Sequence, residues 1–501
     1  MRGPQGNEVE TYSLSNVAAK LLKTDSVRYK IECQLPDSVF VKEKRGAVRI
    51  PFILGMLARV HIEVYLHELN ISGKLRNLSV GGCMVDISLT DSISLNLDHH
   101  IPGITLEFPN GDSFFSEGKI RHIRPLGSNG HAAVGIAFIN LSTLQTEALF
   151  HYVNESEREA AYRTGTNDKM VYHSALFIPG AKEKKIQQRE AHERDKRARQ
   201  TPMERGIMDV AHQLQVGLMY IKNRGVFPSE IFYDCADTLR YLIEQDRKKF
   251  LYALTFLHNE SDWARHSIQV AGQLADMLLL RDPYAPIVRE AILGALLHNL
   301  GKPLLISAQL PTLKANMMPA QKAILLGHVD TLSNKVKELG WVPNPTCQDI
   351  IEKANERLDG TGYPARKQGD QLSELIRLVS VIKAINKLMH ARNGTPPHSP
   401  IDAYRKIHEA DKAFDKTVLV EYIQVYGLYP IGTLAKFSGG FLAWVMDING
   451  KGMPCQVNVI KNLRFPDANI HSIINSEDMQ QIGKLEGIVN PLDYGLKITS
   501  I

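Results

Sequence analysis

The sequence predicts a multidomain α+β protein in which a small antiparallel β-barrel precedes an all-α domain and a short C-terminal β segment. Residues 44–155 contain short alternating runs of apolar and polar residues, separated by turn residues such as Pro109-Asn110-Gly111-Asp112, and this pattern is typical of a small barrel. From residue 201 to about residue 425 the apolar residues recur with the period of an α-helix. A chain of 501 residues is also too long for one ordinary domain.

These patterns divide the chain into five expected parts. They are an N-terminal β segment at 1–43, the barrel at 44–153, a charged linker at 154–200, the helical domain at 201–425 and a β-rich tail at 426–501. The N-terminal segment is expected to hold a strand at Val27–Cys33, where the residues alternate. It is either short by itself or the remnant of a larger domain.

Local signals place several elements more closely. The barrel is expected to close with the strand Ala133–Phe138, and a helix to follow at Thr143–Tyr152. Thr201-Pro202-Met203-Glu204 combines an N-cap threonine, a proline suited to the first turn and a capping-box glutamate, so a helix should begin here. The helical domain should include the amphipathic segments Phe250–Phe256 and Ile268–Leu280, and strand signals return at Gly427–Ile460.

Composition and charge narrow the class of protein. The apolar share of 44% and the charged share of 23% are those of a soluble globular protein. A net charge of +5 permits an anionic ligand but does not by itself indicate nucleic acid. The stretch Lys182–Arg199 interleaves basic and acidic residues, which favours a solvated helix or tether over a nucleic-acid patch.

Cysteine usage and hydropathy indicate a cytoplasmic location. The five cysteines are scattered and form no C-x-x-C pair, as expected for free thiols in a reducing compartment without a zinc ribbon. No apolar run reaches the roughly 18 residues that span a bilayer, and the N-terminus lacks the apolar core of a signal peptide. We expect no membrane association.

A candidate ligand clamp lies at the start of the barrel. Arg45 and Arg49 are four residues apart, and two guanidinium groups that project together can bind phosphate oxygens or a guanine edge in a bidentate manner. About 25 residues later, Asn77 and Ser79 supply short donors and acceptors, and Gly82 lets the backbone approach a ligand closely. The alternative is that the arginines are surface charges and the second motif is an ordinary turn.

In this order and at this distance, the two motifs resemble the PilZ domain, a receptor for cyclic di-GMP. That family carries R-x-x-x-R followed by [DN]-x-S-x-x-G on a small β-barrel, and the resemblance covers roughly residues 44–153. It implies that Arg45 and Arg49 bind guanine and phosphate of cyclic di-GMP. It also implies that Asn77, Ser79 and Gly82 line the opposite side of the ligand.

The helical domain contains scattered residues of the kinds that bind metals. Asp262 and His266 are four residues apart and so share one helix face; His298-Asn299 follows an apolar helix, and His328 comes later. A hydrolytic metal centre needs histidine and carboxylate ligands that converge from several helices. The alternative is that these histidines are core residues with satisfied nitrogens.

The stretch Ala354–Pro364 and the spacing over about residues 205–455 resemble the HD-GYP family of cyclic dinucleotide phosphodiesterases. Its signature reads H-H-E-x-x-D-G-x-G-Y-P, and the second half is intact here. Four positions depart from the family's metal ligands. They are Asn299 in place of Asp, Ala354 and Asn355 in place of two His, and Lys383 in place of a carboxylate.

These departures predict a degenerate metal site. Ala354 has no donor atom, the amides of Asn299 and Asn355 are poor ligands for transition metals, and Lys383 would repel a cation and could pair with Asp262 or another buried acid. We therefore expect no catalytic residue and no required cofactor; a residual iron or manganese ion is the alternative. Lys302, the phosphate-facing lysine of the family motif, either meets an anion or is a solvated charge at a helix end.

Three functions follow, in order of preference. The first is a cyclic di-GMP receptor whose HD-GYP-like domain transmits the signal to a protein partner. By analogy with the family, that partner is a diguanylate cyclase domain or another signalling protein, and Gly362, Tyr363 and Pro364 form the interaction loop, unless this turn merely orients two helices. The second is an active phosphodiesterase regulated by its PilZ domain, and the third is nucleic-acid binding through Lys182–Arg199.

Overall fold

The computed structural model describes residues 19–23, 29–33, 48–53, 55–65, 69–126, 130–165, 172–180, 183, 191, 200–313, 317–390, 396–410, 412–465 and 470–496. The chain forms two compact units, residues 1–48 and residues 49–501. In the first unit, β1 (Ala19–Lys23) and β2 (Tyr29–Cys33) pair antiparallel, with Ala19 opposite Cys33. The strand expected at Val27–Cys33 is thus present from Tyr29, and residues 24–28 lie outside the described residues.

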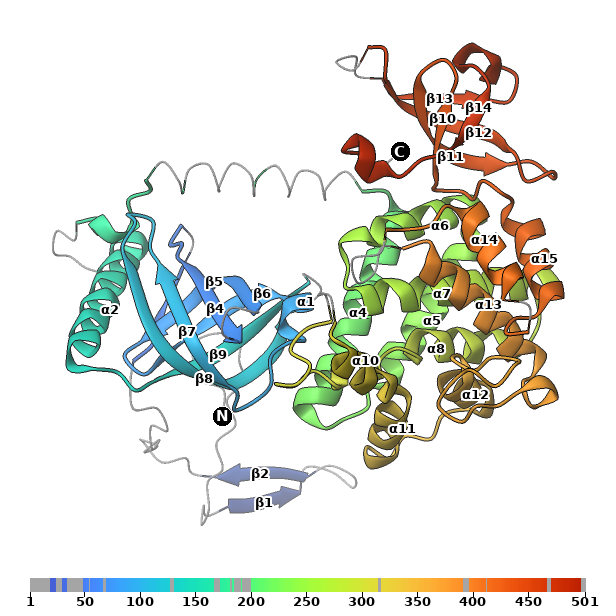
Figure 1. Ribbon diagram of the computed structural model, residues 1–501. Helices are drawn as coiled ribbons and strands as arrows, with labels where there is room; N and C mark the ends of the chain where they lie inside the picture. The colour runs from blue at the N-terminus through green and yellow to red at the C-terminus, as the bar shows by residue number, and fades with distance from the viewer. Residues whose placement is uncertain are drawn as a thin grey trace. The chain divides into compact units, whose positions relative to one another are not determined.

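The second unit begins with a closed antiparallel barrel (Figure 1). Its strands are β3 (Ile50–Pro51), β4 (Arg59–Tyr65), β5 (Leu69–Ser79), β6 (Gly82–Ser88), β7 (His100–Glu107), β8 (Ser113–Leu126) and β9 (His131–Ile139). Six described strands form a ring in the order β5-β4-β7-β8-β9-β6, and β6 pairs back onto β5 to close it, while the short β3 is added to the edge of β5. The predicted barrel is confirmed.

The barrel closes around an apolar interior. Val60, Ile62 and Val64 alternate inward along β4, as the period-two pattern requires. Helix α1 (Leu89–Ser92) follows β6, and the longer α2 (Thr143–Thr164) begins with a capping box formed by Ser142 and Gln145. Figure 1 shows α2 alongside the barrel, where its buried residues join the barrel core.

The predicted end of α2 is wrong. The helix was expected to stop at Tyr152, but it runs twelve residues further, to Thr164. The buried carboxylate of Glu159 accepts hydrogen bonds from Arg163 Nε (2.6 Å) and Ser174 N (3.0 Å) and also contacts His173 Nδ1 (2.6 Å). These contacts fold the chain back, so that a short 3₁₀ helix, Ala175–Phe177, packs into the barrel core.

Most of the charged stretch Lys182–Arg199 lies outside the described residues. Only Glu183 and Ala191 are described within it. The carboxylate of Glu183 binds Arg59 on β4, with 2.7 Å between Glu183 Oε2 and Arg59 Nη1.

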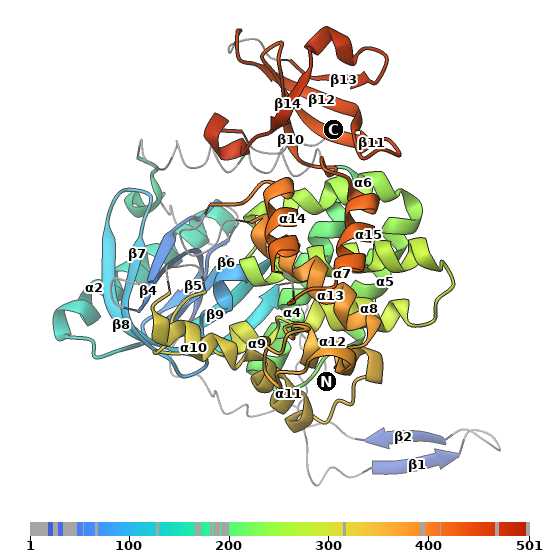
Figure 2. The ribbon, with the colours of Figure 1, turned by 45° about the vertical axis from the view of Figure 1, so that its right-hand side comes forward.

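The helical domain begins as predicted, with a capping box at Thr201 and Glu204 that starts α4 (Pro202–Arg224). The helices that follow are α5 (Ser229–Gln245), α6 (Arg247–Ala253), α7 (Asp262–Arg281), α8 (Val288–Leu297), α9 (Gly301–Leu304), α10 (Pro319–Leu326), α11 (His328–Glu338), α12 (Pro345–Lys353), α13 (Glu374–Leu388), α14 (Pro400–Glu409) and α15 (Lys416–Tyr426). Figure 2 shows α7, α8 and α13 among the other helices of this domain. The segment expected as one helix, Phe250–Phe256, instead changes after Ala253 to the 3₁₀ helix Leu254–Asn259.

Helix α4 also contacts the barrel. Its Met219 is buried within the barrel core. Lys222 is half-buried and donates from Nζ to the carbonyl oxygen of Ile93 after α1 (2.6 Å), and desolvation lowers its pKa to about 8. One helix therefore contributes to both parts of the second unit.

The C-terminal strand prediction is confirmed. Strands β10 (Leu434–Phe437), β11 (Phe441–Ile448), β12 (Pro454–Asn462), β13 (Ser472–Asn475) and β14 (Leu485–Ile488) form one antiparallel sheet in the order β13-β12-β11-β10-β14. Leu434, Leu442 and Trp444 from this sheet pack against Tyr252 and Phe256 of the helical domain. Within the described residues, no helix combines the length and the hydropathy needed to cross a membrane.

Candidate functional site

The residues of the predicted clamp meet where β3 joins β5. Arg45 lies outside the described residues, whereas Arg49 is exposed directly before β3. Ile50 pairs with Leu78, so the antiparallel register places Arg49 opposite Ser79. Asn77 lies on the same strand, half-buried, with its Nδ2 atom 3.9 Å from Met84 Sδ. An exposed guanidinium group and a half-buried amide are thus brought to one end of the barrel.

The two remaining residues of the clamp shape the turn between β5 and β6. Ser79 is buried and donates from Oγ to the carbonyl oxygen of Gly82 (3.0 Å). A Cβ atom at Gly82 would lie 2.2 Å from the carbonyl oxygen of Ile136, so only glycine fits there. Ser79 and Gly82 therefore close the turn that supports Asn77, and the polar groups left for a ligand come from Arg49 and Asn77.

In the helical domain, the structure gathers most of the predicted metal-site residues into one buried cluster. We define the histidine cluster as His266, His298, Asn299, His328, Asn355 and Lys383, all of them buried. The rings of His266 and His298 have centroids 5.6 Å apart. Lys383 donates from Nζ to Asn355 Oδ1 and also lowers the pKa values of His298 and His328 by its charge. The residues of the histidine cluster therefore converge from separate helices, as the sequence predicts.

The histidine tautomers follow from the backbone contacts. His298 Nδ1 lies 2.6 Å from the Ala295 carbonyl oxygen, and His328 Nδ1 lies 2.8 Å from that of Leu325. A carbonyl oxygen only accepts, so each Nδ1 carries the proton. The Nε2 atoms are then lone-pair acceptors, and both are buried without a hydrogen-bond partner. This orientation is one that metal-binding histidines use.

Burial and positive charge keep these histidines neutral. Desolvation, followed by the charges of Lys383 and Lys302, holds the pKa of His298 well below its usual value. Desolvation, followed by Lys302 and Lys383, lowers the pKa of His328 to about 3. Lys302 is half-buried in the last turn of α9, and its charge contributes to the lowered pKa of both rings.

The rest of the donor set does not fit a pair of divalent cations. Asn299 and Asn355 are neutral amides, Ala354 has no donor atom, and the Lys383 ammonium group lies among the histidines. Nowhere in the described ranges do three or more His, Cys, Asp or Glu side chains come together in a group that could hold a metal ion. The two histidines are oriented as ligands, but their surroundings are positive instead of negative.

Asp262, one of the acids that Lys383 could have paired with, has another partner in the structure. Asp262 binds Arg265, one turn along α7, with 2.6 Å between Oδ1 and Nη2, and its side chain is 41% exposed. The Asp262 carboxylate is therefore held by Arg265 near the surface, and not on the helix face that it was expected to share with His266. Asp262 stands at the first residue of α7, where its carboxylate is also stabilised by the helix dipole.

Two residues of this region were not singled out from the sequence. His266 Nδ1 lies 2.5 Å from Asn386 Oδ1, Asn386 Nδ2 donates to Gln269 Oε1 (3.1 Å), and Gln269 Nε2 donates to the Leu254 carbonyl oxygen (3.1 Å). Both residues could have been found by helical spacing, since Gln269 is three residues after His266 and Asn386 is three residues after Lys383.

The D-G-T-G-Y-P turn is held by contacts of its own. The buried carboxylate of Glu356 accepts hydrogen bonds from the backbone N–H groups of Ala365 (2.8 Å) and Lys367 (3.1 Å). A Cβ atom at Gly362 would lie 2.4 Å from Glu356 Cα, so the backbone passes too closely for a side chain. Tyr363 packs edge-on against His328, with ring centroids 5.9 Å apart, while Pro364 is exposed.

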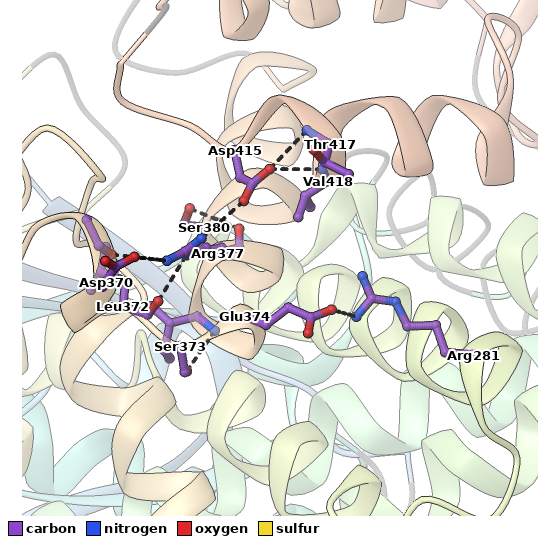
Figure 3. Close-up of polar contacts among 12 residues, drawn as sticks. Arg281, Asp370, Leu372, Ser373, Glu374, Arg377, Ser380, Asp415, Thr417 and Val418 are labelled. Atoms are coloured by element: carbon purple, nitrogen blue, oxygen red, sulfur yellow. Dashed lines mark hydrogen bonds and ion pairs between the residues drawn. The ribbon is translucent and has the colours of Figure 1, made fainter.

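The segment after the turn is fixed by Arg377 on α13, as Figure 3 shows. Its guanidinium group donates to the carbonyl oxygen of Leu372 (3.0 Å) and binds Asp370 and Asp415. Asp415 also caps α15 by accepting from the N–H groups of Thr417 and Val418. The start of α13, which leads to Lys383, is thus tied both to the turn and to α15.

Comparison with known families identifies the two main parts of the chain. Residues 43–155 match the PilZ domain, and residues 243–418 match the HD domain. The chain therefore carries a PilZ domain on the barrel and an HD domain in the helical part. Both resemblances predicted from the motifs are confirmed at this level.

Two curated relatives are similar to part of the chain. A cyclic di-GMP phosphodiesterase of Pseudomonas aeruginosa is 27% identical over 191 residues, 38% of this chain and 45% of the relative. The cyclic di-GMP phosphodiesterase PdeB of Borreliella burgdorferi is 24% identical over 185 residues, 36% of this chain and 48% of the relative. The chain thus spans about half the length of these curated relatives.

Among solved structures, the PilZ domain of YcgR from Escherichia coli, with c-di-GMP, is 18% identical and matches over 25% of this chain and all of that one, with a TM-score of 0.23. An HD-GYP-type protein from Bdellovibrio bacteriovorus is 16% identical and matches over 58% of this chain and 82% of that one, with a TM-score of 0.37.

Proposed function

We propose that this protein is a cytoplasmic receptor for cyclic di-GMP that binds the dinucleotide at the barrel and does not hydrolyse it in the HD domain. The observation that carries the proposal is the pairing of β3 with β5. In this register the exposed Arg49 lies opposite Ser79, on the strand that carries Asn77, in a barrel that matches the PilZ domain. A guanidinium group in that position can bind phosphate or a guanine edge through two parallel hydrogen bonds.

The donor set of the histidine cluster supports the second half of the proposal. A binuclear hydrolytic centre needs an anionic group to bridge its two cations, and here that position is the neutral Asn299. The ammonium group of Lys383 adds a positive charge that repels the divalent cations such a centre would need. We therefore assign the HD domain to signal transmission.

Calorimetry with cyclic di-GMP tests the binding half. We expect the intact protein to bind with a micromolar or lower Kd, and Arg49→Ala to weaken binding at least about tenfold, since a bidentate arginine contact is worth roughly 1–3 kcal/mol. Arg121→Ala is the matched control: it removes the same charge from β8, three strands away from β5 in either direction around the ring. Equal loss of affinity in both variants would contradict a specific site at Arg49.

The curated relatives favour one competing function, hydrolysis of cyclic di-GMP in the HD domain. A phosphodiesterase assay with added Mn²⁺ or Fe²⁺ separates the two proposals. We expect no turnover above the metal-only blank. Turnover that is abolished by His298→Ala would establish the enzyme and refute the receptor without hydrolysis.

We further propose that the G-Y-P turn is the surface for a signalling partner such as a diguanylate cyclase domain. Pro364 is exposed there, whereas Gly362 is buried. Tyr363 also packs on His328, so Tyr363→Ala alone would not separate a lost partner contact from a loss of folding stability. A pulldown with Pro364→Ala, beside Tyr363→Ala, addresses the surface directly, and unchanged capture by both variants would remove this idea.

A further inference from the structure

A cavity of about 700 Å³ lies between the helical domain and the C-terminal sheet. On the helical side its wall includes Leu254, Met389 and Tyr426, and on the sheet side it includes Leu434 and Trp444. None of the residues that line it belongs to the barrel. The cavity is thus separate from the clamp at Arg49.

The residues that line this cavity are of the kinds that form binding sites for small organic molecules. Aliphatic and aromatic side chains dominate it, and the volume falls within the roughly 300–1,000 Å³ that such sites occupy.

Two polar atoms of the lining residues have no hydrogen-bond partner among the described residues. The indole Nε1 of Trp444 is a buried donor in a side chain only 3% exposed, and Gln273 Oε1 is a buried acceptor. Buried polar atoms in native proteins are almost always paired. One donor and one acceptor at the same cavity therefore define what a ligand has to supply.

The two arginines of the wall are already neutralised. Arg247 binds the buried carboxylate of Asp276 through Nε (2.6 Å) and Nη2 (2.9 Å). Arg265 binds Asp262 (2.6 Å). Both guanidinium groups are thus committed to carboxylates, so the wall favours an uncharged ligand over an anion.

We propose that this cavity binds an uncharged, mainly apolar small molecule that carries one hydrogen-bond acceptor for Trp444 Nε1 and one donor for Gln273 Oε1. Gln269 and Asn386, which also line the cavity, connect it by hydrogen bonds to His266. The ligand would therefore lie directly behind the histidine cluster. This site does not depend on cyclic di-GMP binding or on hydrolysis.

Two uncharged fluorescent probes test the site in the full chain. Prodan carries a ketone acceptor and no donor, whereas N-phenyl-1-naphthylamine carries one N–H donor, and the emission of both shifts to the blue in apolar surroundings. We expect saturable binding of each with a blue shift. Trp444→Phe should weaken prodan about three- to tenfold and leave the amine unchanged, and Gln273→Met should do the reverse, because each removes one hydrogen bond.

Two further variants on α15 control for the cavity itself. Val425 lines the cavity, so Val425→Phe should fill it and reduce the affinity for both probes at least tenfold. Val420 on the same helix is 54% exposed and does not line the cavity, so Val420→Phe should change neither affinity.

The outcomes are distinct. Absence of a saturable blue shift with the wild-type protein, or equal binding by Val425→Phe and Val420→Phe, would overturn the site. If Val425→Phe lowers the melting temperature, the comparison of Trp444→Phe with Gln273→Met decides instead. If each of these two variants affects both probes equally, the assigned hydrogen bonds are wrong. A cyclic di-GMP titration of the same variants should be unchanged, which separates this site from the barrel clamp.

Discussion

The barrel rim and the histidine cluster differ in how far their polar residues are exposed to solvent. At the rim, Arg49 is exposed, and the nearby hydrogen bond from Ser79 to Gly82 stabilises a turn. In the helical domain, His298 and His328 are buried with oriented Nε2 atoms, but a lysine shares their site. A set of residues in the right place is therefore insufficient; the sign of the charge around them decides what they can bind.

The largest expected effect comes from reversing that charge. The variant Asn299→Asp, Ala354→His, Asn355→His and Lys383→Asp supplies four anionic or imidazole donors and removes the buried ammonium group. We expect bound metal to rise from a trace to at least one ion per chain, because His298 and His328 are already oriented as ligands. Elemental analysis after dialysis against Mn²⁺ measures it.

A matched control keeps the lysine, with only the first three changes made. If this control binds as much metal as the full variant, Lys383 is not what opposes metal binding. If neither variant binds metal, the packing of the histidine cluster, and not its charge, prevents metal binding.

The second expected effect is a dependence of stability on pH. His298 and His328 have folded-state pKa values below those of the unfolded chain. For His328 this contribution is fully present above about pH 6.5 and is lost as the pH falls toward about 3, because the unfolded chain then binds more protons. In that window His328 contributes a slope of about 1.4 kcal/mol per pH unit, and His298 contributes in the same direction.

Chemical denaturation at a series of pH values measures this slope. His328→Gln, which stays neutral, should reduce the difference in bound protons between the folded and unfolded states by about one. A surface variant, His408→Gln, should leave it unchanged, since His408 is exposed. An unaltered slope in His328→Gln would mean that the ring is already charged in the fold.

At the barrel rim, Gly82→Ala should cost stability mainly through sterics. The added Cβ would meet the Ile136 carbonyl oxygen, and relief requires a shift of backbone that closes the barrel. We expect a loss of roughly 1–3 kcal/mol in the free energy of unfolding, as for overpacking generally. Gly81→Ala is the neighbouring control, because a Cβ there has open space around it.

The smallest effect is expected for Ser79→Ala. It removes one hydrogen bond to the Gly82 carbonyl oxygen and should cost roughly 1 kcal/mol. Its effect on cyclic di-GMP affinity should be smaller than that of Arg49→Ala, because Ser79 is buried and supports the turn. Isothermal calorimetry of the two variants side by side checks this, and a larger loss in Ser79→Ala would place the serine in the ligand contact.

The fold was predictable where periodicity reflects burial on one face. The barrel strands, the capping box at Thr201 and the C-terminal strands all followed from such local patterns. The extension of α2 did not, because it depends on Glu159 meeting His173 and Ser174, which lie beyond the end of the helix. The boundaries of the five expected parts stay predictions.

At the sites, residue types were predictable and partners were not. The motifs singled out His266, His298 and His328, and the structure brings them near one another. Whether Asp262 faces His266 or Arg265 depends on side-chain direction at a helix start, which spacing alone does not determine. The cavity behind Asn386 has no sequence signal at all, since its walls come from segments more than 200 residues apart.

The contacts of Glu356 have a consequence for how such chains change over time. The Glu356 carboxylate accepts from two backbone N–H groups after the turn, and the Tyr363 N–H donates to the backbone carbonyl oxygen of Asn355 (3.3 Å). These contacts use no side-chain atom of Ala354 or Asn355. A mutation that deletes a metal ligand therefore leaves the turn intact, and selection on the turn does nothing to preserve the ligands. The two halves of the motif can be inherited separately, and D-G-T-G-Y-P reports architecture even where the chemistry beside it has been lost.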